Sequence, residues 1–282
     1  MSQDKIESIL KETRRFKPPE EFVSNSQLTV ESIARLKQEA TDNYEKYWAD
    51  LARQEIQWFS PFSEILNERK APNYTWFADG KLNASYNCLD VNVSKHPGKT
   101  AIIFEGENGD VSTLTYSDLL IEVCRFSNGL LSLGVQPLDR VIIYMPMVPE
   151  AIIAMQACAR IGAVHSVVFG GFSAKAMRDR IQDANASLVI TADGGYRGGQ
   201  VIPLKESTDT ALQENCDSVK HVVVLQRAQN KIPMKQDRDI WWHELVEGQD
   251  ETCEAVSVSS EHPLFILYTS GSTGKPKGIQ HS

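Results

Sequence analysis

The fold class is decided by residues 140–192, which read RVIIYMPMVPEAIIAMQACARIGAVHSVVFGGFSAKAMRDRIQDANASLVITA. Short apolar runs that suit strands alternate here with longer amphipathic runs that suit helices. The expected strands are Arg140–Met145, Ser166–Phe169 and Leu188–Thr191, and the expected helices are Pro149–Ile161 and Ser173–Asn185. Strands that alternate with helices in this way are typical of a mainly parallel sheet flanked by helices on both faces. The sequence therefore predicts an α/β fold.

The same kind of pattern continues on both sides of this stretch. Before it, Asn108-Gly109 suits the tight turn of a hairpin, because both residue types tolerate positive φ. The expected elements on this side are strands Ala101–Glu105 and Asp110–Thr115 and helix Ser117–Leu133, with Gly134 as its C-cap. After it, we expect helix Pro203–Glu214 and strands Val219–Leu225 and Leu264–Tyr268.

The first 95 residues have a different character. Apolar side chains recur at helical spacing within residues 29–57, and Thr29 or Ser32 could cap the start of that helix. Three of the five tryptophans precede residue 95, in a region with little strand pattern. We therefore expect residues 1–95 to be a helical and loop extension packed on the core, and residues 96–282 to be the α/β subdomain.

Composition excludes several classes of protein. The 282 residues carry 29 Lys+Arg against 37 Asp+Glu, and 41% are hydrophobic, which suits a globular chain and argues against nonspecific nucleic-acid binding. No apolar run approaches the roughly 18 residues of a membrane helix, and the N-terminus lacks the apolar core of a secretory signal. The five cysteines are scattered without a C-x-x-C pair, which predicts reduced thiols in the cytoplasm and no metal site. We expect no nucleic-acid or membrane partner.

The segment richest in chemistry is YTSGSTGKPKG, residues 268–278, directly after the last predicted strand. Its glycines let backbone N–H groups converge on an anion, its hydroxyls can donate to phosphate oxygens, and its lysines add charge. The spacing is not that of the common nucleotide P-loop, which needs four residues between its glycines and Ser or Thr after its lysine. The predicted phosphate ligands are Thr269, Ser270, Gly271, Ser272, Thr273, Gly274, Lys275 and Lys277.

This segment resembles the phosphate-binding signature of adenylate-forming enzymes. GKLNASYNCLD at 80–90, VVFGGFS at 167–173 and IPLK at 202–205 are similar to AMP-forming acetyl-CoA synthetases, and the likeness extends over essentially the whole chain. The resemblance implies the N-terminal part of the large domain of such an enzyme. It also implies the activity: acetate and ATP, with Mg²⁺, give acetyl-adenylate and pyrophosphate, and the acetyl group then passes to CoA. Thr269–Lys277 would hold the β- and γ-phosphates.

A second predicted site follows from the same resemblance. ADGGYRGGQ at 192–200 is similar to the family segment that binds the adenosine-phosphate end of CoA, and this assigns Arg197, Gly198, Gly199 and Gln200 to CoA. A guanidinium suits a 3′-phosphate. The family pattern has a second arginine where this chain has Gln200. Phe169, Gly170 and Gly171 are expected on the same route, because parallel sheets gather ligands at the carboxyl ends of their strands. Asp193 is expected to be a turn residue.

Several alternatives stay open at this point. Full synthetases are more than twice as long, so we expect this stretch alone to be inactive and to hold no catalytic residue. The acyl substrate could be acetate, propionate or a longer acid, and the sequence does not fix the oligomeric state. A kinase-like phosphotransferase is disfavoured by the missing P-loop spacing, and a non-catalytic module that binds CoA or nucleotide is the remaining alternative.

Overall fold

The computed structural model describes residues 14–269 and 276–282. Contacts divide the chain into two compact units, Met1–Ala52 and Arg53–Ser282, and each is described by itself. The boundary predicted between residues 95 and 96 stays a prediction. Among the described residues, no helix is both long and apolar enough to cross a lipid bilayer.

The N-terminal unit is helical. It contains α2 (Glu20–Ser24), α3 (Val30–Asp42) and most of α4 (Tyr44–Glu55). Thr29 caps α3 as predicted: its side chain accepts a hydrogen bond from the backbone N–H of Ser32, and the Ser32 hydroxyl accepts one from the N–H of Thr29. The helical structure predicted within residues 29–57 is confirmed, but it consists of two helices, because Asn43 leaves helical geometry at φ −133° and separates α3 from α4.

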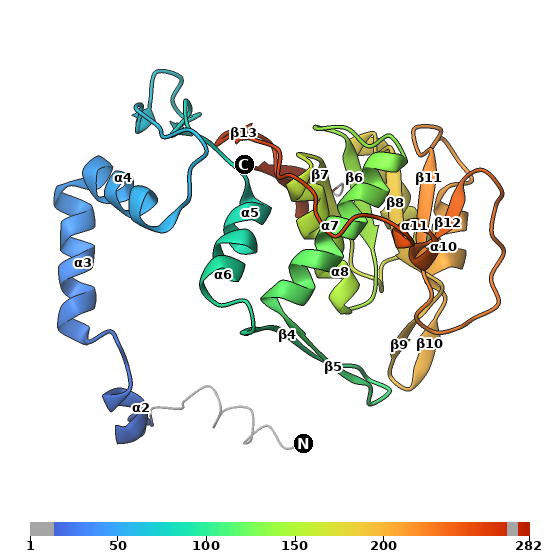
Figure 1. Ribbon diagram of the computed structural model, residues 1–282, viewed down its shortest axis with the longest axis horizontal. Helices are drawn as coiled ribbons and strands as arrows, with labels where there is room; N and C mark the ends of the chain where they lie inside the picture. Colours follow the sequence, from blue (N-terminus) through green and yellow to red (C-terminus); the bar gives the residue numbers. More distant parts are fainter. Residues whose placement is uncertain (1–13, 270–275) are drawn as a thin grey trace, which may run out of the picture. The chain divides into compact units, whose positions relative to one another are not determined.

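The second unit is built on a seven-stranded sheet in the described residues, with the order β12-β11-β8-β6-β7-β14-β15 (Figure 1). Its strands are β6 (Arg140–Tyr144), β7 (Val164–Val167), β8 (Leu188–Ala192), β11 (His221–Leu225), β12 (Asp239–Trp241), β14 (Phe265–Thr269) and β15 (Lys277–His281). Every neighbouring pair is parallel except β14 and β15. The predicted mainly parallel α/β fold is confirmed.

Helices cover both faces of this sheet. One face packs against α7 (Tyr116–Ser132), α8 (Pro149–Arg160) and α11 (Trp242–Val246), and the other against α9 (Ala174–Ala184) and α10 (Leu204–Ala211). The alternation along β6 shows why its last four residues are all buried and largely apolar: Val141 and Ile143 point into the first layer, whereas Ile142 and Tyr144 point into the second. All four are essentially inaccessible to solvent.

Shorter elements surround the sheet. They are α5 (Ala84–Cys88), α6 (Asp90–Lys95), β1 (Leu66–Asn67), β2 (Thr75–Trp76), β3 (Lys81–Leu82), β4 (Thr100–Glu105), β5 (Val111–Thr115), β9 (Gly195–Arg197), β10 (Gln200–Ile202) and β13 (Val258–Ser259). The predicted β4–β5 hairpin is confirmed, with Gly109 at φ +83° in its turn. The predicted end of α7 is also confirmed, and Gly134 follows it at φ +82°.

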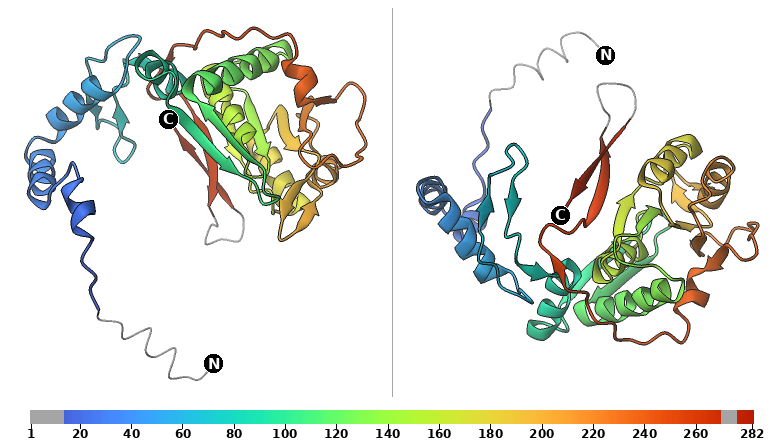
Figure 2. Two further views of the ribbon diagram at one scale, coloured as in Figure 1. Left: turned by 60° about the horizontal axis from the view of Figure 1, so that its bottom comes forward. Right: turned by 90° about the horizontal axis from the view of Figure 1, so that it is seen from above.

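The path of the chain through the sheet creates a place for a ligand. From β6 the chain passes through α8 to β7 on one side, and from β7 it passes through α9 to β8 on the other side of β6. The connection that leaves β6 thus runs through α8 toward β7, whereas the one that leaves the adjacent strand β8 runs through α10, on the other face, in the opposite direction toward β11. Open α/β sheets bind ligands at such a switch point, beyond the carboxyl ends of the strands. Figure 2 shows β14 and β15 as the red hairpin that ends the sheet.

Candidate functional site

A cavity of about 330 Å³ lies at the carboxyl ends of β6, β7 and β8. Loops that follow separate strands line it. Their contributions include Met145–Val148 after β6, Phe169–Gly171 after β7, Gly195–Arg197 after β8 and Arg227 after β11. Four of the predicted CoA residues, Phe169, Gly170, Gly171 and Arg197, are therefore brought together from two loops. Gly198, Gly199 and Gln200 do not line the cavity and form the end of the neighbouring hairpin instead.

At the two glycines after β7, neighbouring atoms lie so close to the backbone that a side chain would collide with them. Neither has positive φ. A Cβ atom on Gly170 would lie 3.0 Å from the carbonyl oxygen of Met145. A Cβ atom on Gly171 would lie 2.5 Å from Nη1 of Arg197 and 2.6 Å from the ring of Phe169. The absence of side chains here lets Arg197 lie against the loop, with its guanidinium 5.3 Å from the ring centroid of Phe169.

The hairpin of β9 and β10 carries Arg197 into the cavity. Arg197 pairs with Gln200, so only Gly198 and Gly199 remain in the turn, at φ +60° and +72°. Two consecutive residues with positive φ make the tight turn that suits a twisted hairpin, and glycine adopts it without strain. The N–H of Gly199 donates to Glu107 Oε1 at 2.8 Å. The glycines of the predicted CoA segment thus shape the hairpin that presents Arg197.

Arg227 is a cavity residue that was not predicted. Its Nη2 donates to Asp110 Oδ1 at 2.8 Å and to Asn108 Oδ1 at 3.0 Å, and a second contact joins Nη1 to Asp110. Its guanidinium lies 5.5 Å from the ring centroid of Phe104 and 5.4 Å from that of Tyr196. The hydrogen bond to Asp110 raises the pKa of Arg227, and the same bond lowers the pKa of Asp110. The pair ties the β4–β5 hairpin to the cavity wall.

Asp193 holds two of these loops together, in keeping with its predicted turn role. The side chain is fully buried. Its Oδ1 accepts hydrogen bonds from the backbone N–H groups of Gly194, Arg227 and Ala228 at 2.7–2.9 Å, and Oδ2 accepts one from Asn230 at 2.9 Å. Four donors on one carboxylate fix the loop after β8 against the loop after β11.

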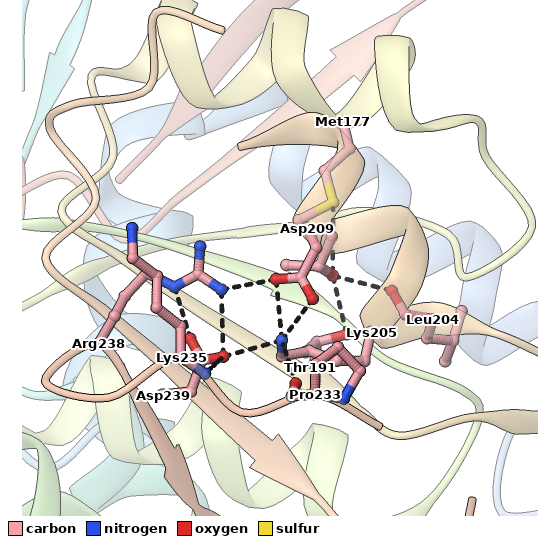
Figure 3. Close-up of polar contacts among 10 residues, drawn as sticks. Met177, Thr191, Leu204, Lys205, Asp209, Pro233, Lys235, Arg238 and Asp239 are labelled. Atoms are coloured by element: carbon pink, nitrogen blue, oxygen red, sulfur yellow. Dashed lines mark hydrogen bonds and ion pairs between the residues drawn. The ribbon is translucent and has the colours of Figure 1, made fainter. Parts of the chain in front are cut away.

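A buried ion cluster holds the helix that follows the hairpin. Leu204, the first residue of α10, lines the cavity, and its neighbour Lys205 is completely buried. Figure 3 shows Lys205 Nζ between Asp209, at 2.7 and 2.8 Å, and Asp239, at 2.8 Å. Burial raises the pKa of Asp239, but hydrogen bonds from Arg238 and Lys205 outweigh it and hold that pKa below its ordinary value. The cluster fixes α10 to β12.

Only the two ends of the predicted phosphate loop fall within the described residues. Ser270, Gly271, Ser272, Thr273, Gly274 and Lys275 lie outside them. Thr269 ends β14 and Lys277 begins β15, and the two are paired in the antiparallel ladder. Both are exposed. Since β14 runs parallel to β7, Thr269 emerges at the same edge of the sheet as the cavity loops.

The comparisons with known proteins agree with this geometry. The profile of the AMP-binding enzyme family matches residues 89–282, and that of the acetyl-coenzyme A synthetase N-terminus matches residues 33–88. An α/β sheet with a cavity lined by loops at its carboxyl edge, combined with these matches, defines the class: the chain belongs to the AMP-binding enzyme family.

Within that family, the chain is similar to acetyl-coenzyme A synthetases. It is 56% identical over 279 residues to the one from Chromobacterium violaceum, 56% identical over 279 residues to the one from Thiobacillus denitrificans, and 55% identical over 276 residues to the one from Pasteurella multocida. Each match covers 98% of this chain. The chain spans only 42–43% of the length of these relatives.

Proposed function

We propose that the protein carrying this chain is an AMP-forming acetate–CoA ligase. It joins acetate to ATP, giving acetyl-adenylate and pyrophosphate, and then transfers the acetyl group to the thiol of CoA. The observation that carries the proposal is the common edge of the sheet, where the cavity lined by Phe169–Gly171 and Arg197 lies and where β14 delivers Thr269. The acetyl-coenzyme A synthetases that match 98% of the chain support the acetate assignment.

In this proposal, Thr269–Lys277 binds the β- and γ-phosphates of ATP. Adenylation expels pyrophosphate, so the protein assists mainly by positioning the phosphates and neutralising their charge. Mg²⁺ arrives with the nucleotide, because it retains waters and is bound largely through substrate phosphates. In the described part of the chain, no three His, Cys, Asp or Glu side chains are placed to hold a metal.

Arg197 is proposed to bind the 3′-phosphate of CoA, with Gly198, Gly199 and Gln200 beside it and Phe169–Gly171 along the cavity wall. The stacking on Phe169 restricts the arginine side chain before the ligand binds, so less side-chain entropy is lost on binding. The five cysteines are all unpaired, and we place the reaction in the reducing cytoplasm on that ground.

The proposal is tested on the full-length protein with two assays: acetate-dependent exchange of pyrophosphate into ATP, and acetyl-CoA formation. Lys275→Ala or Gly274→Val should impair the exchange. Arg197→Ala should raise the KM for CoA and leave the exchange unchanged. Arg125→Ala is the matched control, because Arg125 pairs with Glu122 and Glu251 outside the cavity lining.

Three outcomes would contradict these assignments. If neither Lys275→Ala nor Gly274→Val lowered the pyrophosphate exchange, the assignment of the phosphate loop to ATP would be wrong. Equal losses in both assays for Arg197→Ala would remove Arg197 from the CoA site. If kcat/KM were higher for propionate than for acetate, the assignment of acetate as the acyl substrate would be wrong.

A further inference from the structure

A row of stacked side chains connects the cavity to the strand that leads into the phosphate loop. We call Phe169, Phe172, Arg180 and Tyr268 the stacked row. The ring centroids of Phe169 and Phe172 are 5.9 Å apart in an edge-to-face arrangement. The guanidinium of Arg180 lies 4.9 Å from the ring centroid of Phe172 and 5.1 Å from that of Tyr268. The row thus runs from the loop after β7, through α9, to the end of β14.

Arg180 occupies an unusual environment for an arginine. It is only 6% exposed, and in the described part of the chain it forms no ion pair with a carboxylate. Its Nη1 donates to the carbonyl of Ala176 at 2.6 Å, within its own helix. The two aromatic faces are therefore its main partners outside α9, and a desolvated cation between ring faces is held strongly and in a defined plane.

Tyr268 is fixed on several sides. Its hydroxyl donates to Asp183 Oδ2 at 2.7 Å, and its ring lies against Arg180, so two residues of α9 hold it. Burial and Asp183 raise the pKa of Tyr268, so the phenol stays protonated and remains a donor. Gly278 is its partner across the β14–β15 ladder, and a Cβ atom there would lie 3.2 Å from the ring. Tyr268, a residue of β14, thus contacts both α9 and β15 close to the start of the predicted loop.

We infer that Arg180 is a positioning residue for the phosphate loop. It holds Tyr268, the residue directly before Thr269, in a fixed relation to Phe172 and hence to the cavity loop. Arg180 acts through these rings and does not itself touch ATP. The inference rests on the proposed function, in which Thr269–Lys277 binds the phosphates of ATP. Displacement of that loop by a fraction of an ångström weakens a site whose work is positioning.

The test compares two arginines of the same helix in the full-length enzyme. Arg178 lies two residues before Arg180, and its guanidinium bonds to Ala211, Thr210 and Glu214, away from the stacked row. Arg180→Met should raise the KM for ATP in acetate-dependent pyrophosphate exchange by about 3- to 10-fold, as expected when a bound substrate is mispositioned. Arg178→Met should leave that KM unchanged even where it lowers the melting temperature. Equal ATP KM values for the two variants would overturn the inference.

Two further measurements separate positioning from simple destabilisation. Phe172→Leu combined with Arg180→Met should be non-additive in the KM for ATP, because both residues act through the same contact. Additive effects would overturn the inference. If Arg180→Met does not fold, Arg180→Lys replaces it: lysine keeps the charge but lacks the planar face, so the KM for ATP should still rise, and an unchanged KM would overturn the inference.

The wild-type assay keeps the two proposals distinct. Absence of acetate-dependent exchange in the wild-type enzyme would reject the proposed function itself. Normal wild-type exchange with indistinguishable Arg180 and Arg178 variants would reject only the role of Arg180.

Discussion

Arg197 and Gln200 are direct partners across the β9–β10 hairpin, one on each side of its two-glycine turn. Directly paired residues in an antiparallel ladder project to the same face, so a cation at position 200 would lie beside the guanidinium of Arg197. Gln200 can hydrogen-bond but adds no charge. The hairpin therefore presents one positive charge where the family resemblance leads us to expect two.

Gln200→Arg should strengthen the binding of CoA. A charge-assisted hydrogen bond to phosphate exceeds a neutral one by roughly 1 kcal/mol, which corresponds to a decrease in the KM for CoA of about fivefold. The gain should vanish with 3′-dephospho-CoA, which lacks the phosphate concerned. An equal gain with both forms of the substrate would show that position 200 does not face the 3′-phosphate.

Gly171→Ala should disturb the same site from the opposite wall. The new methyl group would lie 2.5 Å from Nη1 of Arg197 and 2.6 Å from the ring of Phe169, so both side chains must move. We expect the KM for CoA to rise by about tenfold, the effect of losing roughly 1.4 kcal/mol of binding, and to rise more than the KM for ATP in pyrophosphate exchange. Gly98→Ala is the control, because no atom lies within 4 Å of the position that its new methyl group would take. Similar effects of the two substitutions would contradict the steric explanation.

Most of the α/β core was predictable because its signal is local. The apolar runs and helical periodicity between residues 100 and 225 correspond to β4–β8, α7–α10 and β11, within a few residues. The strand expected at Ser166–Phe169 lies two residues earlier, at Val164–Val167. Its apolar run continues past the ladder, which ends where Val167 pairs with Ile143, and Phe169 is half exposed at the cavity. The apolar run that predicted the strand therefore also contains Phe169, a residue of the cavity lining.

The elements missed by the prediction depend on distant partners. β15 has only one aliphatic residue, Ile279, and becomes a strand because the edge of β14 offers a ladder. β9 and β10 are three residues each, β12 is equally short, and α11 has five residues, too few to show a period. Local patterns do not contain this information.

The candidate site divides in the same way. The rule that ligands gather at carboxyl ends correctly brought Phe169–Gly171 and Arg197 to one cavity, although their role in CoA binding stays a prediction. The pairing of Arg227 with Asp110 joins residues 117 positions apart, and no local sequence pattern predicts it. The position of Arg227, two residues after a predicted strand, was the one available signal.

Lys205→Met should destabilise the fold strongly. It removes the ammonium between Asp209 and Asp239 and leaves Arg238 as the one cation in contact with both carboxylates among the described residues. Removal of one partner from a buried ion pair costs about 3–5 kcal/mol in the free energy of unfolding, and the remaining pairing with Arg238 places the expected loss at the lower end of that range. Urea unfolding followed by circular dichroism measures the loss. Lys175→Met is the control: Lys175 forms an i,i+4 pair with Asp179 like that of Lys205 with Asp209, but on the surface, so its loss should have little effect. Equal effects would contradict the role of burial.

His165 should make the protein sensitive to mild acid. It is 8% exposed on β7, its Nδ1 has no hydrogen-bond partner among the described atoms, and burial lowers its pKa from 6.5 to about 4. Between these values the unfolded chain binds a proton that the folded chain does not, so stability falls as the pH drops and is fully present only above about pH 6.5. The full loss of this contribution lowers the free energy of unfolding by about 3 kcal/mol. His165→Phe should reduce the decline in unfolding free energy between pH 6.5 and 4 by that amount, whereas His243→Phe, at an exposed position, should retain it. A decline that persists in His165→Phe would assign the acid sensitivity to other groups.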